Sequence, residues 1–198
     1  MPSFSRRRVL ATGAAALLAG VAGCADSGGA STDTPTATER SFEHSVSDPA
    51  ARTVRNDDGE PAVTSSARST DESMLGTPTR MADEYWTVND ADERDALDFS
   101  GARTGAEAAR TFAAETDLST ATLVVHQYYV EKCVTRRLER LRWGAAEQGP
   151  EGSAAIRLTY EDAERDGDCE QEGIGPIEAT VFRIPEEIGQ VTRFGYQV

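Results

Sequence analysis

The stretch that decides the fold is TATLVVHQYYVEK, residues Thr120–Lys132. Its bulky side chains fall on both alternating faces: Val124, Tyr128 and Val130 on one, and Leu123, Val125 and Tyr129 on the other. A strand with one solvated face alternates apolar with polar residues, whereas a strand covered on both faces does not. The segment therefore predicts a central strand in a sheet that is covered on both sides.

Further strands are predicted before and after this segment, from β-forming residues in alternation. They are Glu84–Val88, residues 154–162 (AAIRLTYED), Ile177–Pro185, and a final edge strand that carries Phe194, Tyr196 and Val198. In the second of these, Ile156, Leu158 and Tyr160 share one face. Pro185 ends the third, because proline cannot donate to a strand ladder. Short connections between most neighbours make antiparallel pairing the default expectation.

Residues Cys133–Trp143 fit two patterns. Val134, Leu138 and Leu141 have helical spacing, whereas Leu141 and Trp143 alternate as in a strand. We favour the strand, with a turn near Glu147–Gly152 that completes a hairpin.

One short helix is expected from Gly105 to Glu115, with Phe112 as its main apolar anchor. Thr104 and Glu107 have the spacing of a capping box, in which each side chain caps a backbone amide near the helix start. Residues 40–80 are polar and are expected to be mostly irregular. The fold class is therefore α+β, mainly β: an antiparallel sheet with one short helix in a domain at 82–198, preceded by a disordered tether.

The N-terminal residues resemble an export signal. Arg6, Arg7 and Arg8 precede an uncharged run from Val9 to Ala22, which is shorter than the roughly 20 apolar residues that a membrane span needs. The paired arginines before an apolar pair resemble a twin-arginine signal. The alternative is a chance apolar helix with a buried cysteine.

Val21-Ala22-Gly23-Cys24 resembles a lipobox, in which the thiol receives lipid and becomes the first mature residue. Two acyl chains give stable membrane attachment where one does not. We expect a signal peptide at 1–23, and a lipidated Cys24 with a largely disordered linker at 24–81. The linker is rich in Ser, Thr, Gly and Asp and has little apolar surface to bury.

The composition is strongly acidic, with a formal net charge of −14. The acidic residues are dispersed along the chain, and Lys132 is its single lysine. This resembles proteins of extreme halophiles, whose charged surfaces stay hydrated in molar salt. The charge argues against nucleic acid as a partner.

Two cysteines remain besides Cys24, namely Cys133 and Cys169. On the oxidising side of a membrane, such an even pair predicts a disulfide, worth about 4 kcal/mol in the chain-entropy model. The alternatives are two free thiols or a metal site. Neither cysteine lies in a CxxC pattern or has a nearby histidine, which disfavours metal.

The segments TDLSTATLVVHQ, IRLTYEDAERDGDC and IEATVFRIP, with a cysteine-bearing strand between the first two, resemble the C-terminal half of lipoproteins common in haloarchaea. That resemblance covers Thr116–Pro185 and implies no activity. A further similarity is to the PrcB C-terminal domain, a protease-complex-stabilising module, with an LVV strand and a late strand that ends in Ile-Pro. In place of a Gly-Gly-Tyr-like segment, this chain has residues 130–136.

Asp162, Glu164, Asp166 and Asp168 place carboxylates at alternate positions, with Gly167 sixth, as at the start of an EF-hand calcium loop. The twelfth position, where a bidentate glutamate is expected, is Gly173. The alternative is a solvated hairpin loop next to Cys169.

His126 is the only histidine in a predicted strand, and a hydrolase would need a nucleophile and a carboxylate beside it. The sequence contains no G-x-S-x-G motif, so we interpret His126 as a hydrogen-bonded sheet residue. We assign no catalytic residue.

Arg136, Arg137, Arg140 and Arg142 form a basic cluster in an acidic chain. It could receive an acidic partner or polysaccharide, or it could pair with Glu139, Asp162 and Glu164. We favour pairing within the chain.

These patterns predict a lipid-anchored protein on the extracytoplasmic face of the cell membrane. Its domain is expected to bind or stabilise another envelope component, with no enzymatic activity and no cofactor. The alternatives are an accessory lipoprotein that binds an ion or small molecule and, after it, a secreted hydrolase.

Overall fold

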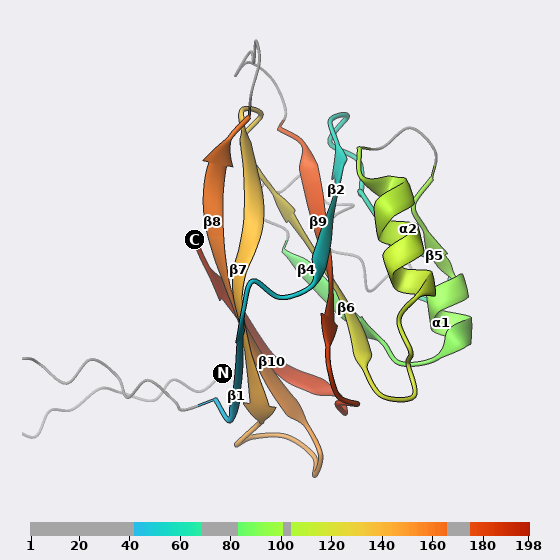
Figure 1. Ribbon diagram of the computed structural model, residues 1–198, viewed down its shortest axis with the longest axis vertical. Helices are drawn as coiled ribbons and strands as arrows, with labels where there is room; N and C mark the ends of the chain where they lie inside the picture. Colours follow the sequence, from blue (N-terminus) through green and yellow to red (C-terminus); the bar gives the residue numbers. More distant parts are fainter. Residues whose placement is uncertain (1–41, 69–82, 101–103, 166–174) are drawn as a thin grey trace, which may run out of the picture. The chain divides into compact units, whose positions relative to one another are not determined.

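The computed structural model of the chain describes residues 42–68, 83–100, 104–165 and 175–198. They form two four-stranded sheets, a two-stranded sheet and two helices (Figure 1). Sheet A has the order β1-β7-β8-β10, sheet B has the order β2-β9-β6-β4, and β3 pairs with β5. The elements are β1 (His44–Ser47), β2 (Ala51–Asn56), β3 (Thr64–Ser65), β4 (Glu84–Val88), α1 (Ala91–Asp95), β5 (Leu97–Asp98), α2 (Ala106–Ala114), β6 (Thr122–Tyr129), β7 (Val134–Ala145), β8 (Ala154–Glu164), β9 (Ile177–Ile184) and β10 (Val191–Gln197).

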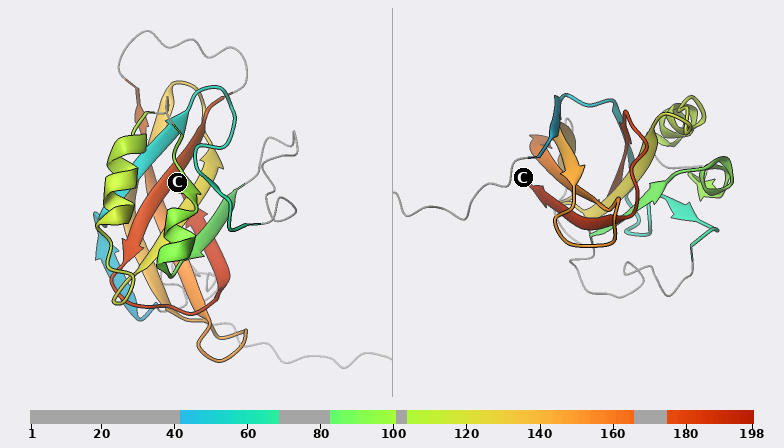
Figure 2. Two further views of the ribbon diagram at one scale, coloured as in Figure 1. Left: turned by 90° about the vertical axis from the view of Figure 1, so that its right-hand side faces the viewer. Right: turned by 90° about the horizontal axis from the view of Figure 1, so that it is seen from below.

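The two large sheets pack face to face, and the helices lie on the outer face of sheet B (Figure 2). Between the sheets lies one apolar cluster, with Val124, Leu141, Leu158 and Phe182 at its centre. A second cluster joins sheet B to α2 through Val125, Val181, Ala109 and Phe112, among others. Sheet B is therefore the middle of three layers.

β6 confirms the prediction of a central strand covered on both sides. Val124 and Tyr128 face sheet A, whereas Leu123 and Val125 face α2. These four side chains have no solvent exposure. β6 pairs antiparallel with β9 on one side and with β4 on the other.

The ambiguous segment after Cys133 is a strand, as predicted. β7 forms a long antiparallel hairpin with β8, interrupted by a register shift between Leu138 and Arg140. The turn closes where the amide of Ala146 donates to the carbonyl of Ser153 at 2.8 Å. Leu138, Leu141 and Trp143 all face the core between the sheets, because the register shift moves the alternation by one residue.

The last strand departs from the expectation of antiparallel pairing. β10 is an edge strand, as predicted, but it pairs parallel with β8. The chain between them passes through β9, which belongs to sheet B. Parallel neighbours need such a crossover connection, and a local alternation pattern carries no information about it.

Strands occur before the expected start of the domain at 82, although more than half of the described residues 42–68 lie outside strands, as expected. β1 pairs with β7 and β2 pairs with β9, so both belong to the large sheets. Their sequences, HSVS and ARTVRN, are polar and contain only one fully buried apolar side chain, that of Val54. Pairing with long partner strands stabilises them, and their own composition does not indicate it.

Two expectations about helices also need correction. The expected helix is α2, but its N-cap is Gly105, which makes no side-chain capping bond, so the capping box of Thr104 and Glu107 does not form. The Thr104 carbonyl instead accepts from the amide of Arg55 at 2.9 Å. The second helix, α1, was not predicted because none of its five residues is buried. Asp90 caps it by accepting from the amide of Glu93 at 2.8 Å.

Arg6, Arg7 and Cys24, with the predicted signal peptide and the linker to residue 41, lie outside the described residues. Within the described ranges, the helices are too short or too polar to span a membrane.

Candidate functional site

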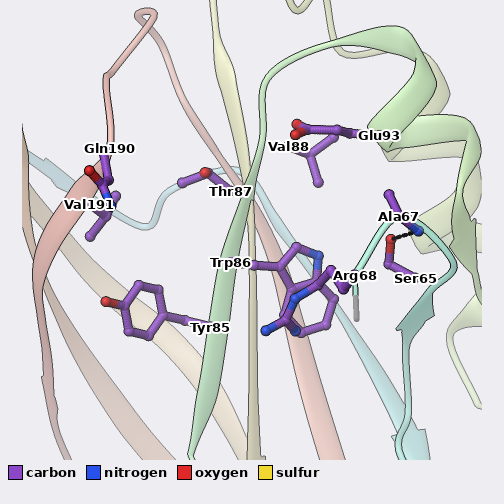
Figure 3. Close-up of a pocket in the computed structure, with 10 residues that line it drawn as sticks. All are labelled: Ser65, Ala67, Arg68, Tyr85, Trp86, Thr87, Val88, Glu93, Gln190 and Val191. Atoms are coloured by element: carbon purple, nitrogen blue, oxygen red, sulfur yellow. Dashed lines mark hydrogen bonds between the residues drawn. The ribbon is translucent and has the colours of Figure 1, made fainter. Parts of the chain in front are cut away.

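A groove runs along the outer edge of β4, which is an edge strand of sheet B (Figure 3). Its volume is about 420 Å³. One wall is formed by Ser65, Ala67, Arg68 and Glu93, the other by Gln190 and Val191, and Tyr85–Val88 of β4 lie between them. We call this the β4 groove. Among the described residues, the only strand that pairs with β4 is β6.

The groove opens where the two sheets fail to join. β4 and β10 contact each other through side chains: the rings of Tyr85 and Phe194 stack at 4.0 Å, and the Tyr196 hydroxyl donates to Asp83 at 2.7 Å. No strand ladder connects β4 with β10 in the described part of the chain. Beyond these contacts, the groove continues between Thr87 of β4 and Gln190, which precedes β10.

Trp86 forms the apolar side of the β4 groove and is 9% exposed. The Arg68 guanidinium lies over its indole ring, 4.5 Å from the ring centroid, and donates to the Glu84 carboxylate at 2.5 Å. The indole N–H of Trp86 is buried and has no hydrogen-bond partner in the part of the chain that the structure describes. The side of the groove next to Trp86 therefore carries the Arg68 guanidinium, which is paired with Glu84. It also carries the indole N–H, which has no acceptor among the described residues.

Glu93 supplies the charge of the groove. Its side chain extends from α1 over Val88 (Figure 3). One carboxylate oxygen accepts from the amide of Asn89 at 2.8 Å, and no basic residue in the described ranges pairs with it. Arg68 is paired with Glu84, so Glu93 is the charged residue of the lining that has no basic partner within the described ranges.

His126 lies in the core between the sheets, behind the contact of β4 with β10. It is fully buried, and its Nδ1 lies 2.8 Å from the Tyr160 hydroxyl. The rings of Tyr128, Phe194 and Tyr196 surround it at centroid distances of 4.8 to 5.2 Å. The interpretation of His126 as a hydrogen-bonded sheet residue is thus supported. Its Nε2 is buried and has no partner among the residues described.

Burial lowers the pKa of His126 to about 3, and the nearby positive charge of Arg136 acts in the same direction. The imidazole is therefore neutral at physiological pH.

We predict that this histidine makes folding sensitive to acid. Below pH 6.5 the unfolded chain binds a proton that the folded chain does not bind until about pH 3, so acid favours unfolding. Relative to His126→Phe, the wild type should lose about 2 kcal/mol of unfolding free energy between pH 8 and pH 5. Urea unfolding of both proteins at constant salt measures this difference. Identical pH dependence in the two proteins would contradict the prediction.

A buried ion pair that was not predicted from the sequence joins β2 to β9. Arg55 is 5% exposed, Glu178 is fully buried, and Nη1 of the arginine lies 2.8 Å from Oε1 of the glutamate. The guanidinium also donates to the carbonyls of Lys132 and Val134, both at 2.6 Å. Oε2 of Glu178 accepts from the amide of Arg136 at 3.0 Å. Both charged groups have partners, so the pair holds the connection between β6 and β7 in place.

A sequence signal for this pair did exist. Glu178 lies inside an otherwise apolar strand, IEATVFRI, and a carboxylate there requires a cation when the strand is buried. The position of that cation, 123 residues earlier, could not be inferred from the pattern.

The four arginines of the predicted cluster are distributed along β7. Arg136 pairs with Asp162 at 2.9 Å, and its guanidinium lies 5.2 Å from the ring centroid of Tyr128. Arg137 pairs with Asp48 at 2.6 Å and with Glu161 at 2.7 Å. Arg140 and Arg142 follow on the same strand, opposite Ser47 and Ser45 of β1. Arg136 and Arg137 therefore pair within the chain, and Asp162 is one of the three partners that were expected.

The calcium and disulfide predictions fall partly outside the described residues. Asp162 and Glu164 end β8, whereas Asp166, Asp168 and Cys169 are not described. Within the described ranges, no group of three or more acidic, histidine or cysteine residues could hold a metal ion. Cys133 is disulfide-bonded. The assignment of Cys169 as its partner stays a prediction.

Comparison with known proteins finds no matching family model, no similar curated protein and no similar solved structure.

Proposed function

We propose that this chain is a cell-surface lipoprotein whose domain binds or stabilises another component of the cell envelope without catalysing a reaction. The observation that carries the proposal is the β4 groove, which lies beside a sheet edge that no described strand covers. Proteins protect such edges because an unpaired strand is a template for association with another chain. An open edge with a groove beside it is therefore a candidate binding surface.

The chemistry elsewhere in the described domain supports binding over catalysis. The buried Arg55–Glu178 pair has its hydrogen bonds made within the fold. His126 lies beside tyrosine and phenylalanine rings, and Tyr160 is its hydrogen-bond partner. A general base must reach the substrate proton that it abstracts, and His126 is fully buried among aromatic rings.

Location is the second part of the proposal. The Arg6-Arg7 pair supports export through the twin-arginine pathway, and the lipobox at Cys24 supports a lipid anchor. The acidic composition supports a halophilic source, and the resemblance to haloarchaeal lipoproteins points the same way. The similarity to the PrcB C-terminal domain suggests stabilisation of a protein complex as the kind of task.

A small-molecule-binding accessory lipoprotein is the second candidate. The volume of the β4 groove, about 420 Å³, lies within the range of small-ligand pockets. Trp86 and Tyr85 supply the aromatic surface that such sites use. The position of the groove along a strand edge favours a polypeptide.

The first test is affinity purification of the tagged protein from native membranes in molar salt, with mass spectrometry of what is recovered. We expect a stoichiometric protein partner. Recovery of the lipoprotein alone, under conditions that preserve membrane complexes, would overturn the proposed binding function and favour the small-molecule candidate.

We predict that Cys24→Ser releases the protein from the membrane, because the hydroxyl cannot take the place of the lipidated thiol. Fractionation of cells into membrane, soluble and medium fractions measures this. Ser27→Ala, in the same linker, is the matched control and should stay membrane-bound. Retention of the Cys24→Ser protein in the membrane fraction would contradict the lipid anchor.

A further inference from the structure

We propose that the β4 groove binds an extended segment of a partner protein as an added strand, and that this segment presents a basic side chain to Glu93. This inference rests on the proposed binding function and names the form and charge of the partner.

The backbone of β4 supports the addition of a strand. In an antiparallel edge strand, every second residue directs its N–H and C=O away from the sheet. In sheet B, the ladder on the inner side of β4 is made with β6 along all five residues, Glu84–Val88. The other edge strand of this sheet, β2, is bridged by Thr104 and has α2 beside it. Among the described residues, the β6 ladder is the backbone pairing that Tyr85–Val88 make, so we take the outer edge of β4 as the place where an incoming strand would pair.

The alternation of side chains along β4 also supports the addition of a strand. Tyr85 and Thr87 lie toward Gln190 and Val191, whereas Trp86 and Val88 lie toward the other wall (Figure 3). An added strand places successive side chains on opposite faces of a sheet. Its side chains would therefore meet the two walls in turn, which is how strand addition obtains specificity.

The charges of the groove residues favour a segment with a basic side chain. The cation in the groove, Arg68, is paired with Glu84, whereas Glu93 has no basic partner among the described residues. α1 adds Asp92 beside Glu93, whereas its Asp95 pairs with Arg94 at 3.1 Å. A lysine or arginine on the incoming strand would supply the missing cation. A second copy of this chain, with a net charge of −14, matches the groove less well.

The test uses the full-length protein in its native membranes, with a photo-crosslinking benzoylphenylalanine at Gln190 in the groove. Thr111, exposed on α2 and outside the groove, is the control position. We expect crosslinks from position 190 only, to a partner peptide that contains lysine or arginine. Crosslinks to this chain's own sequence, equal crosslinking from both positions, or none from position 190 would each overturn the inference.

Hydrogen exchange of the purified complex tests the added strand directly. Alternate amides within Tyr85–Val88 should exchange at least tenfold more slowly in the complex than in the protein alone. The amides of β2 serve as the internal control and should not change. Unchanged exchange in β4, with partner bound, would overturn strand addition while leaving the proposed binding function intact.

A charge variant tests the predicted basic side chain. Glu93→Gln keeps an oxygen that can accept from Asn89 but removes the charge, and it should weaken partner binding about fivefold or more at low salt. Asp92→Asn, on the same helix and outside the groove lining, is the matched control. Equal affinity of Glu93→Gln and wild type would overturn the charge assignment. Failure to recover any partner would instead refute the proposed function itself.

Discussion

Replacement of Arg55 by methionine should lower the free energy of unfolding by about 3–5 kcal/mol, the usual cost of removing one partner from a buried ion pair. Glu178 is fully buried, so the variant leaves an uncompensated carboxylate in the core. The substitution also removes the donors to the carbonyls of Lys132 and Val134. Chemical denaturation at constant salt, by intrinsic tryptophan fluorescence, measures the loss.

Arg52→Met is the matched control, because Arg52 is an exposed arginine on the same strand. Its substitution should change stability by no more than about 1 kcal/mol. The double variant Arg55→Met/Glu178→Leu removes both charges and should be more stable than Arg55→Met alone, since no buried charge is left unpaired. A double variant less stable than the single one would show that the carbonyl contacts, and not the ion pair, dominate.

This pair matters for the domain as a whole because it ties three segments together. Arg55 comes from β2 and Glu178 from β9, and the accepting carbonyls belong to Lys132, in the connection between β6 and β7, and to Val134, which begins β7. Cys133 lies in that same connection. We therefore expect the Arg55→Met protein to exchange the amide of Arg136, which donates to Glu178, much faster than wild type.

Gly105→Ala should lower the free energy of unfolding by about 2–5 kcal/mol, for two additive reasons. Gly105 has a φ of 81°, where a side chain costs about 1–2 kcal/mol. A Cβ at this position would also lie 2.1 Å from the carbonyl oxygen of Thr53, and such overpacking typically costs about 1–3 kcal/mol. α2 begins at the next residue, so the clash falls where this helix meets β2.

Gly152→Ala separates the two reasons. Gly152 has nearly the same φ, 82°, but a Cβ there meets no atom within 4 Å. Its substitution should cost only the backbone share, about 1–2 kcal/mol. If both alanine variants lost the same stability, the close approach of Gly105 to Thr53 would have no energetic weight.

The strands of the core could be predicted because their residues repeat with a recognisable period. β6 has apolar residues on both faces, and β8 alternates buried and partly exposed residues from Ile156 to Tyr160. These patterns depend only on which faces of a strand are desolvated. They therefore indicate a strand without indicating its neighbour.

The elements that were not predicted, β1, β2 and α1, have no such repeating pattern of apolar residues. β1 and β2 are polar segments that become strands because β7 and β9 offer them a ladder. α1 buries no side chain, and the N-terminus of α2 is determined by its approach to Thr53, which is distant in the sequence. Stabilisation of these segments comes from partners that a local pattern cannot contain.

The β4 groove could not be predicted from the sequence for the same reason. Its lining comes from the end of β3, from β4, from α1 and from the residues that begin β10. None of these segments carries a motif, and only the crossover of the chain between the sheets brings Gln190 near Thr87.

The sequence by itself determined that the domain is mainly β, that β6 is its covered central strand, and that the chain is strongly acidic. Tertiary structure alone decided the parallel partner of β10, the Arg55–Glu178 pair and the open edge of β4. The period of the apolar residues indicates which faces of a strand are buried, and this is a local property of the sequence. Pairing partners, buried charges and uncovered edges depend on contacts between residues far apart in the chain, and these form only when the sheets assemble.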